Sequence, residues 1–547
     1  MPACSPLDQF LKWEKEIPDT VYLQQPFNNI WKTWTWAQAG EESRKMAAAL
    51  QSLGLPAKSH IAILSKNCAQ WIMADLAIMM AGYISIPVYP TLSDHAIQII
   101  LEHSETKAII IGKLDDYPSQ KNGISGTIIK IGMQSYGINE QLTWEEMVQK
   151  NKPINEIYSW QKDDLLTIIY TSGTTGMSKG VMHTAGNFDI TLTTAIKDLQ
   201  LPLHPDLFSY LPLSHIAERV GIEMNSFYTG ARVSFAESLE SFSRNMAHIQ
   251  PHLFFAVPRI WAKFREGIHL KLPQKKLNLL IAIPIISNVI KKNIKKKLGL
   301  SRATHIYSAA APISHDLLKW FDKLGITILQ AYGMSEDCVY AHFCRPNANR
   351  FGSVGLPFTG LQVKIAADGE ICVKSEGNMK GYYHEPALTS QAFDEENFLK
   401  TGDMGEIDKD GYLFITGRVK DQFKTDKGKY ISPASIELKL LANSDIDQAC
   451  VVGTGIPQPI ALISLSDKGK KKSKGELNES LLDTLSGINP GLEKFEMLEK
   501  IVIMNESWTI ANGMITPTLK VKRNEIEKIH LPKYPKWFEK KETIVWE

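Results

Sequence analysis

The chain has 547 residues, of which 44% are hydrophobic and 22% are charged, and its formal net charge at pH 7 is +2. A chain of this length exceeds what one hydrophobic core supports, so we expect at least two domains of ordinary globular composition. The small net charge gives no reason to expect a nucleic-acid partner or a strong general attraction to membranes.

The cysteines and the N-terminal residues indicate the cellular compartment in which we expect the protein. The six cysteines form no Cys-x-x-Cys pair and no zinc-like cluster with histidines. We therefore expect reduced, mostly buried thiols, which suits a cytoplasmic protein. The first ten residues lack a basic segment followed by an apolar core, and no uninterrupted apolar run is long enough to span a bilayer.

Strands and helices are predicted to alternate between residues 35 and 112. Thr35 and Gln38 form a capping-box pattern before a helix that Gly54 closes. The alternation predicts a parallel sheet with helices on its faces, and such sheets bind ligands at the carboxyl ends of their strands. The expected strands are 60–64, 84–88 and 107–111, and the expected helices are 70–81 and 93–103.

A strand predicted from Leu165 to Tyr170 leads into a segment rich in glycine and hydroxyl groups. Glycines let several backbone N–H groups point into one concavity, hydroxyls add rotatable donors, and Lys179 adds a cation. These groups suit a polyphosphate, although the spacing is not that of a Walker A loop, and the alternative is an ordinary surface loop. The candidate nucleotide-binding residues are Thr171, Ser172, Gly173, Thr174, Thr175, Gly176 and Lys179.

The order Thr-Ser-Gly-Thr-Thr-Gly-x-x-Lys-Gly after a strand resembles the phosphate loop of the adenylate-forming superfamily, which includes acyl-CoA synthetases, peptide-synthetase adenylation domains and luciferases. Ser178 stands where that family usually has proline. Further segments follow in the family's order, so the resemblance covers about residues 8 to 530. Residues 210–219, Tyr-Leu-Pro-Leu-Ser-His-Ile-Ala-Glu-Arg, are similar to long-chain fatty acyl-CoA synthetases. The resemblance implies that His215 lies near the carboxylate and the α-phosphate; the alternative is a structural histidine.

Two segments after predicted strands suit adenine and a metal ion. Small residues after the strand at 305–308 let a flat ring approach the backbone, and residues 330–336 combine an aromatic ring, a glycine and a carboxylate. Mg²⁺ takes oxygen ligands. The resemblance places the nucleotide beside Ala310, Ala311, Tyr332, Gly333, Met334 and Ser335, and the metal between Glu336 and Thr171. The alternative for Glu336 is a carboxylate at a helix start.

Short strands broken by glycine and aspartate follow residue 361 and predict an antiparallel, barrel-like subdomain. We expect residues 1–417 to form a large AMP-binding domain and residues 418–547 a small mobile α+β domain. By resemblance, Asp403 accepts the ribose hydroxyls, and Arg418 reaches ribose or phosphate. Lys424 belongs to the same nucleotide site, and Lys420 is the hinge.

A basic segment near the C-terminus, 520–523, resembles the mobile lysine loop of the family. Lys520 matches the catalytic position, and Lys522 is the competing assignment. An ammonium on a long stem can neutralise charge that develops between a carboxylate and the α-phosphate. The alternative is a solvated basic helix start.

Two lysine-rich segments stand apart. Residues 275–297 carry the apolar run 277–290 between basic clusters, a pattern that can lie in a membrane interface. The alternative is a core helix with a solvated basic end, and Pro284 argues against one straight helix. Residues 468–474 hold five lysines and are expected to form a solvated loop.

Together these segments predict an α/β fold: a large N-terminal domain of parallel sheets with helices, a small barrel-like β subdomain and a small C-terminal domain. The resemblance implies a long-chain fatty acyl-CoA synthetase that uses ATP, Mg²⁺ and CoA, with Lys520, His215 and Lys179 as catalytic residues. It is expected in the cytoplasm, with peripheral contact on the inner face of a membrane left open. The chain length of the acid and the oligomeric state are left open as well.

Two other functions remain as alternatives. One is a ligase that loads the acyl group onto a carrier protein instead of CoA. The other is a nucleotide- or acyl-binding protein that has lost its chemistry. The presence of Lys179, Glu336, Asp403, Arg418 and Lys520 argues against the second alternative.

Overall fold

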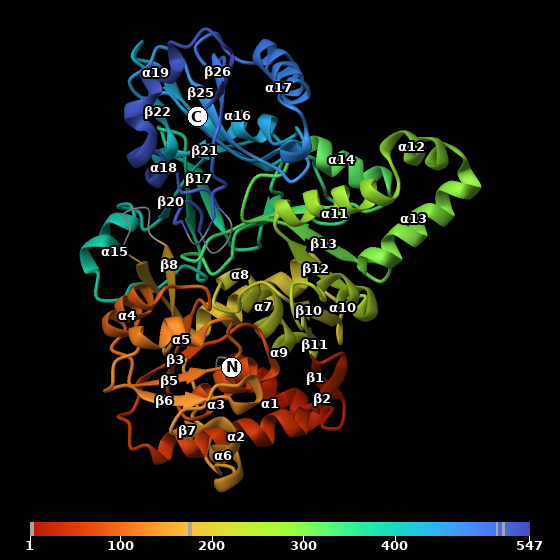
Figure 1. The fold of residues 1–547 in the computed structure, drawn as a ribbon. Coiled ribbons are helices and arrows are strands. Elements are labelled where there is room, and N and C mark those ends of the chain that lie inside the picture. The colour runs from red at the N-terminus through yellow and green to blue at the C-terminus, as the bar shows by residue number, and fades with distance from the viewer. Residues whose placement is uncertain (1–4, 173–177, 510–511, 517–519) are drawn as a thin grey trace.

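The structure is a computed structural model that describes residues 5–172, 178–509, 512–516 and 520–547, without the side chain of Ser172. Two large sheets with helices on their faces form the N-terminal part, a small antiparallel sheet follows, and a smaller C-terminal unit lies beyond it (Figure 1). The predicted α/β fold class is confirmed.

The first large sheet has the strand order β19-β9-β8-β4-β3-β5-β6-β7. Its central strands are parallel and buried, and β9 is antiparallel to β8. The capping box of Thr35 and Gln38 begins α2, and every residue of α3 is buried. The bounds are β3 His60–Leu64, β4 Ile84–Val88, β5 Ala108–Ile111, β6 Ile129–Gly132, β7 Leu142–Thr143, β8 Leu165–Ser172, β9 Ser178–Thr184, β19 Gly381–Tyr382, α2 Trp36–Ser52, α3 Ala69–Met80, α4 Asp94–His103, α5 Tyr117–Gln120 and α6 Trp144–Lys150.

The second large sheet has the order β16-β15-β14-β13-β12-β10-β11-β1-β2. Its middle strands are parallel, and β1 near the N-terminus pairs in parallel with β11. The bounds are α1 Pro6–Glu16, β1 Val21–Phe27, β2 Ile30–Thr35, β10 Asp206–Ser209, β11 Arg232–Phe235, β12 Leu253–Ala256, β13 His305–Ser308, β14 Leu329–Tyr332, β15 His342–Phe343, β16 Leu356–Pro357, α7 Ala185–Leu199, α8 Ile216–Glu218, the π-helix η3 Arg219–Met224, α9 Asn225–Thr229, α10 Phe242–Ile249, α11 Pro258–Lys271 and α14 His315–Lys323.

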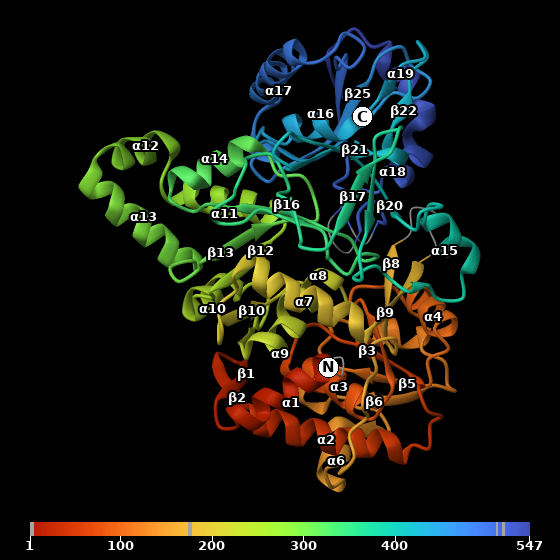
Figure 2. The same ribbon diagram turned by 180° about the vertical axis from the view of Figure 1, so that it is seen from behind.

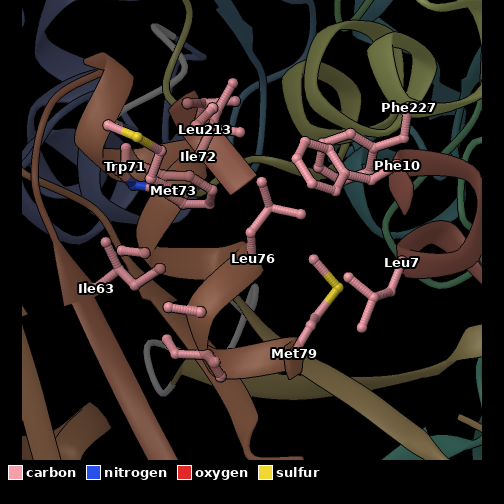
Figure 3. Close-up of a cluster of buried hydrophobic side chains, with 14 of the residues drawn as sticks. Leu7, Phe10, Ile63, Trp71, Ile72, Met73, Leu76, Met79, Leu213 and Phe227 are labelled. Carbon is pink, nitrogen blue, oxygen red and sulfur yellow. The ribbon is translucent and has the colours of Figure 1, made fainter. Parts of the chain in front are cut away.

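One hydrophobic core joins the two large sheets. In Figure 3, Leu7 and Phe10 of α1 lie opposite Leu76 and Met79 of α3, and all four belong to one buried cluster. Phe10 packs edge-on against Phe227, with ring centres 5.8 Å apart. Burial of this apolar surface fixes the two sheets against each other and so sets the distance between the loops that follow their strands.

A helical arm projects from the second sheet (Figures 1 and 2). It consists of α12 (Gln274–Ala282) and α13 (Pro284–Leu298). Pro284 occupies the first turn of α13, where a missing N–H costs nothing, so the apolar run forms two helices and not one. The core-helix alternative is wrong, because most of the run is exposed.

The small sheet has the order β17-β18-β20-β21 and is antiparallel throughout, as predicted. The C-terminal unit beyond it has its own sheets, β22-β23 and β24-β25-β26-β27, and its own buried clusters. The bounds are β17 Gln362–Ile365, β18 Glu370–Lys374, β20 Leu399–Ile407, β21 Leu413–Arg418, β22 Phe423–Lys424, β23 Tyr430–Ile431, β24 Ile446–Val452, β25 Ile460–Leu465, β26 Lys500–Ile503, β27 Ile544–Trp546, α15 Pro386–Ala392, α16 Pro433–Leu440, α17 Lys474–Ile488, α18 Arg523–His530 and α19 Tyr534–Phe538.

The cysteines, the lysine-rich segment 468–474 and the helix lengths were also predicted from the sequence. Among the described residues the cysteines are free and buried, as predicted. The segment 468–474 is mostly exposed, as predicted, and two of its lysines make contacts: Lys472 pairs with buried Asp445, and Lys470 donates to Ser507. In the part of the chain that the structure describes, no helix combines the length and the apolar character needed to cross a bilayer.

Candidate active site

A cavity of about 2620 Å³ opens between the two large sheets, the small sheet and the C-terminal unit. Side chains that the sequence places hundreds of residues apart line its wall together. The predicted site residues found there are Thr171, Lys179, His215, Ala310, Ala311, Tyr332, Gly333, Met334, Ser335, Glu336, Asp403, Arg418, Lys420 and Lys520.

The remaining predicted site residues stand apart. Gly173, Thr174, Thr175 and Gly176 lie outside the described residues, and so does the side chain of Ser172. Lys424 differs from the prediction, because its ammonium lies over the ring of Tyr430, 5.6 Å from the centre, and the described cavity wall does not include it. It belongs to β22, the first strand of the C-terminal unit, which turns its side chain to solvent.

The segment expected to bind phosphate connects two antiparallel strands and not a strand and a helix. Thr171 of β8 pairs with Lys179 of β9 in the register of the hairpin. Residues directly opposite in such a pair project from the same face of the sheet, so a hydroxyl and an ammonium flank the predicted phosphate segment. Because β8 runs parallel to β4, this segment lies at the carboxyl end of the sheet, as predicted.

Tyr382 connects the phosphate side of the cavity to the predicted metal ligand. Its hydroxyl donates to Glu336 across 2.9 Å, and the ammonium of Lys179 lies 4.9 Å from the centre of its ring. Burial raises the pKa of the Glu336 carboxyl, and the Tyr382 hydrogen bond and the charge of Lys179 oppose that rise. The result is a buried carboxyl group held in place by a phenol and facing a cation.

The donor set around Glu336 fits Mg²⁺. This ion is commonly held by one or two protein oxygens together with phosphate oxygens, and not by a cage of side chains. Within the described residues no group of three acidic, histidine or cysteine side chains could hold a metal ion by itself. Glu336 and the Thr171 hydroxyl therefore suit an ion that also needs the phosphates of a nucleotide.

Asp403 is held from two sides. The guanidinium of Arg418 donates through Nε to Oδ1 across 2.7 Å, and the Tyr332 hydroxyl donates to Oδ2 across 2.9 Å. Asp403 and Arg418 are direct partners in the β20–β21 ladder. A carboxylate oxygen has a second lone pair, so Asp403 can still accept hydrogen bonds from a pair of ribose hydroxyls.

The backbone on the opposite wall adopts unusual conformations. Ala310 follows β13 with φ of +70°, in the left-handed region that glycine enters most easily. An alanine at this position therefore holds a backbone conformation that glycine adopts with less strain. Nearby, His183 donates through Nε2 to the carbonyl of Ser335 across 2.7 Å, and burial lowers the pKa of His183 to about 4.

His215 is a neutral imidazole. Its Nδ1 accepts from the backbone N–H of Ala217 across 3.1 Å at the start of α8, so the proton resides on Nε2. Burial and then the charge of Lys520 lower the pKa of His215 to about 4. His215 therefore offers the cavity an N–H donor without a positive charge.

Lys520 comes from the C-terminal unit but reaches into the cavity of the N-terminal part. Burial lowers the pKa of its ammonium and Arg418 lowers it further, whereas Asp403 and Glu336 raise it. These three partners and His215 place Lys520 among the predicted nucleotide groups. Lys522, the competing assignment, also lines the cavity.

A buried polar network under the site was not foreseen from the sequence. Arg219, fully buried, donates to Thr167 on β8, to Ser85 on β4 and to Asp75 on α3. Burial and Asp75 raise the pKa of nearby Glu223, whose carboxyl lies 3.3 Å from Nε of Arg219, so Arg219 is placed between two carboxyl groups. The network fixes the helix after His215 to the strand that carries Thr171.

A second unforeseen contact holds the segment before His215. Asn67, at the carboxyl end of β3, donates to Ser209 and to the Leu211 carbonyl and accepts from the Leu213 N–H across 3.1 Å. Glu218 accepts from Ser209 and from the Tyr210 N–H, and burial raises its pKa to about 8. Most residues of the Leu-Pro-Leu-Ser-His-x-x-Glu-Arg pattern thus hold the segment in place. The pattern itself was the signal from which these contacts could have been found in the sequence.

Two family models match the chain. An AMP-binding enzyme model matches residues 10–383, and an AMP-binding enzyme C-terminal domain model matches residues 420–530. The chain belongs to the AMP-binding enzyme family. It is a ligase that uses ATP and activates a carboxylate as its adenylate, as the resemblance implied.

Several curated relatives match almost the whole chain. A long-chain-fatty-acid–CoA ligase, FadD15, of Mycobacterium bovis is 27% identical, and the match covers 94% of this chain and 93% of that protein. The long-chain-fatty-acid–CoA ligase ACSBG2 of Xenopus laevis is 29% identical over 94% of this chain and 80% of its own length. The long-chain-fatty-acid–CoA ligase 5 of Mus musculus is 27% identical over 92% and 83%.

Solved structures share the fold. The adenylation domain of a carboxylate reductase from Mycobacterium chelonae superposes with a TM-score of 0.82 at 18% identity, covering 99% of this chain and 92% of its own. The anthranilate CoA ligase AuaEII in complex with anthranoyl-AMP gives a TM-score of 0.79 at 20% identity, covering 96% and 98%. At these identities the likeness establishes the architecture of both the N-terminal and the C-terminal parts.

Proposed function

We propose that this enzyme is a long-chain fatty acid–CoA ligase that forms acyl-AMP and then acyl-CoA. The observation that carries the proposal is that one cavity joins the nucleotide groups to an apolar wall. On α7, Leu192, Ala195 and Leu199 lie on one helical face and line that wall, and Phe255 and Phe343 line it as well. An alkyl chain buried against such a wall gains about 0.8 kcal/mol for each CH₂ group.

In the first step an oxygen of the fatty acid carboxylate attacks the α-phosphorus of ATP, and the bond to the departing pyrophosphate breaks. Lys520 neutralises the charge that develops between carboxylate and α-phosphate, and the N–H of His215 donates to an oxygen there. Lys179 and Thr171 hold the phosphates, and Asp403 with Arg418 holds the ribose. Positioning and fixed charge supply the rate enhancement, because no covalent nucleophile is needed.

Glu336 and Thr171 are the residues that would hold Mg²⁺. When bound there, the ion would neutralise phosphate charge. Tyr382 keeps the Glu336 carboxyl in place, and the ammonium of Lys179 lies beside the Tyr382 ring.

In the second step the thiol of CoA attacks the carbonyl carbon of acyl-AMP, and AMP leaves. The space that Lys520 occupies must then open. We infer a domain boundary between residues 417 and 418, with Lys420 as the hinge. Lys420 is exposed and lies in the short 3-10 segment η4, Val419–Asp421, directly after β21. Hinges are a few such positions that absorb a change in φ and ψ.

A panel of acids tests the substrate class and the acceptor separately. ATP–pyrophosphate exchange is measured with carboxylic acids from acetate to the C18 acid, and CoA or a carrier protein is then added. Exchange that peaks with long acids, followed by release of acyl-CoA, is the expected outcome. Transfer to the carrier protein with none to CoA would establish the carrier-loading alternative, and no exchange with any acid would establish a binding protein.

We also propose where in the cell the enzyme works. A long-chain acid partitions into lipid, and so an enzyme in the cytoplasm that consumes it benefits from peripheral contact with the inner face of a membrane. Residues 275–297 are the segment proposed for this contact, on the strength of their apolar and basic composition.

A further inference from the structure

The tip of the helical arm exposes apolar side chains that no other described part of the protein covers. On α12, Leu279 is 67% exposed, and on α13, Ile285 is 81% and Val289 is 55% exposed. Ile283 and Ile286 beside them are exposed as well. Single exposed apolar residues are common on soluble proteins, but five of them within eleven residues at one projecting tip mark an interaction surface.

The two faces of α13 have different roles. Ser287 on the inner face is buried, and Ile290, Ile294 and Leu298 pack against the core of the second sheet. The outer face carries Ile285, Val289, Lys292 and Lys296, spaced at i, i+4, i+7 and i+11, so these four lie in one line along the helix. The line is apolar at the tip and basic toward the body of the protein.

The charge of this region is one-sided. No aspartate or glutamate occurs between Glu266 and Asp316, whereas eight lysines and Arg302 do. The whole chain has a net charge of only +2, so the excess is local. Among the lysines of the arm, Lys275, Lys276, Lys292, Lys296 and Lys297 are exposed.

We propose that the outer face of the α12–α13 arm docks on a lipid surface that contains anionic phospholipids. Lys292 follows Ile285 by about 10 Å along the helix axis, at 1.5 Å for each residue. With the tip of the arm pointing into the lipid, insertion of its apolar side chains by about 5–10 Å leaves the lysines at the level of the phosphates. A second copy of this chain is the weaker candidate, because its arm would present the same positive charges.

The base of the arm forms part of the cavity wall. Leu270 at the end of α11, Pro273, and Gln274 at the start of α12 line the same cavity as Lys520. The indole of Trp320 donates to the Gln274 side chain across 2.8 Å and fixes the arm at this point. A docked arm therefore holds this part of the cavity wall near the lipid surface. The route that this gives a fatty acid rests on the function proposed above.

Sedimentation with vesicles tests the docking directly. The full chain is mixed with vesicles of phosphatidylcholine alone or of equal parts phosphatidylcholine and phosphatidylglycerol. We expect binding to the second kind, weakened by salt and reduced on the order of tenfold by Lys292→Gln with Lys296→Gln. The pair Ile285→Ser with Val289→Ser should reduce it similarly, and the control pair Lys121→Gln with Lys152→Gln, exposed lysines outside the arm, should not.

Several outcomes would overturn the docking proposal. These are equal binding by all variants, binding by none, or equal binding to both kinds of vesicle. A dimer that Ile285→Ser with Val289→Ser converts to monomer without lipid would make the arm a self-association surface instead. ATP–pyrophosphate exchange with a water-soluble acid is measured on the same variants and separates the two proposals. If docking is lost and exchange is intact, the substitutions affect only the arm. If exchange is absent and docking is intact, the proposed chemistry is wrong and the docking proposal stands.

Discussion

The hydroxyl of Tyr382 donates to the buried carboxyl of Glu336 across 2.9 Å, although Tyr382 lies on the short edge strand of one sheet and Glu336 follows the last parallel strand of the other. This contact joins the two halves of the candidate nucleotide site. The metal role of Glu336 can therefore be tested by changing either Glu336 or Tyr382.

We expect Glu336→Gln to lower acyl-AMP formation on the order of 10²-fold, because an amide is a far weaker Mg²⁺ ligand than a carboxylate. The loss should shrink as Mg²⁺ is raised. Tyr382→Phe leaves the ligand but removes its hydrogen bond, so the Mg²⁺ concentration for half-maximal rate should rise about 10-fold. If high Mg²⁺ rescues neither variant and ATP affinity is unchanged, the metal role is wrong.

Removal of the Lys520 ammonium should affect the first half-reaction. We expect Lys520→Ala to lower ATP–pyrophosphate exchange on the order of 10²-fold or more, while thioester formation from supplied acyl-AMP survives. Lys522→Ala is the matched control and should remain near normal. A large loss of exchange in Lys522→Ala with near-normal exchange in Lys520→Ala would assign the catalytic role to Lys522.

The depressed pKa of Lys520 gives a second readout. Because burial and Arg418 lower the pKa of this ammonium, kcat/KM should fall at a lower pH than an ordinary lysine would allow. Lys520→Arg keeps the charge at high pH, so its remaining activity should lack that alkaline fall. An unchanged pH profile in Lys520→Arg would assign the alkaline limb to another group.

Proline at position 420 should separate the two half-reactions. It fixes φ near −65° and would hold the C-terminal unit in one orientation. We expect Lys420→Pro to retain pyrophosphate exchange with a long-chain acid and to lose most CoA-dependent product, with Lys420→Ala as the control. Equal slowing of both half-reactions, or of neither, would make Lys420 an ordinary linker residue.

The buried ion pair beneath the site should matter for stability. Arg219→Met leaves the carboxylate of Asp75 buried without its partner and should lower the free energy of unfolding by about 3–5 kcal/mol. Lys150→Met, which breaks the exposed pair with Glu146, should cost about 0.5 kcal/mol or less. Chemical denaturation of both variants measures the difference. A recovery of stability in Arg219→Met with Asp75→Leu is expected, and its absence would locate the cost elsewhere.

Stability should also depend on pH through His183. Its pKa is about 4 in the folded state and 6.5 ordinarily, so between these values the unfolded chain binds a proton that the folded chain does not. The free energy of unfolding therefore rises with pH in that window, by up to about 1.4 kcal/mol for each pH unit from this group. His183→Phe should show a correspondingly smaller slope. Parallel slopes for the two proteins would mean that His183 protonates in the folded state.

Local signals explain what could be predicted from the sequence. The helix capped by Thr35 and the strands β3 and β4 were predicted within a residue of their observed ends, because caps, periodicity and turn residues act over a few positions. The motif residues Asp403, Arg418 and Lys520, which the resemblance assigns to one nucleotide site, all line the cavity.

Long-range contacts explain what was missed. Strand β9 was not foreseen, because Ser178–Thr184 is recognisable as a strand only beside β8. The partner of Arg219 is 144 positions away, and a sequence pattern cannot indicate a contact at that separation. Lys424 was carried to the nucleotide site by the motif around it, but the β22–β23 hairpin directs it away.

The pairing of β1 with β11 has a consequence for the order in which the chain can fold. Leu23 lies beside Val233, so the first strand of the protein belongs to the second sheet, and most strands of the first sheet come between these two partners in the chain. A contact over such a separation is made late, because the entropy of closing a long loop must be offset before the contact stabilises anything. During synthesis the edge of β1 that pairs with β11 therefore stays without its partner strand until residues 232–235 have left the ribosome. Over that interval the nascent chain is most exposed to aggregation and most in need of chaperones.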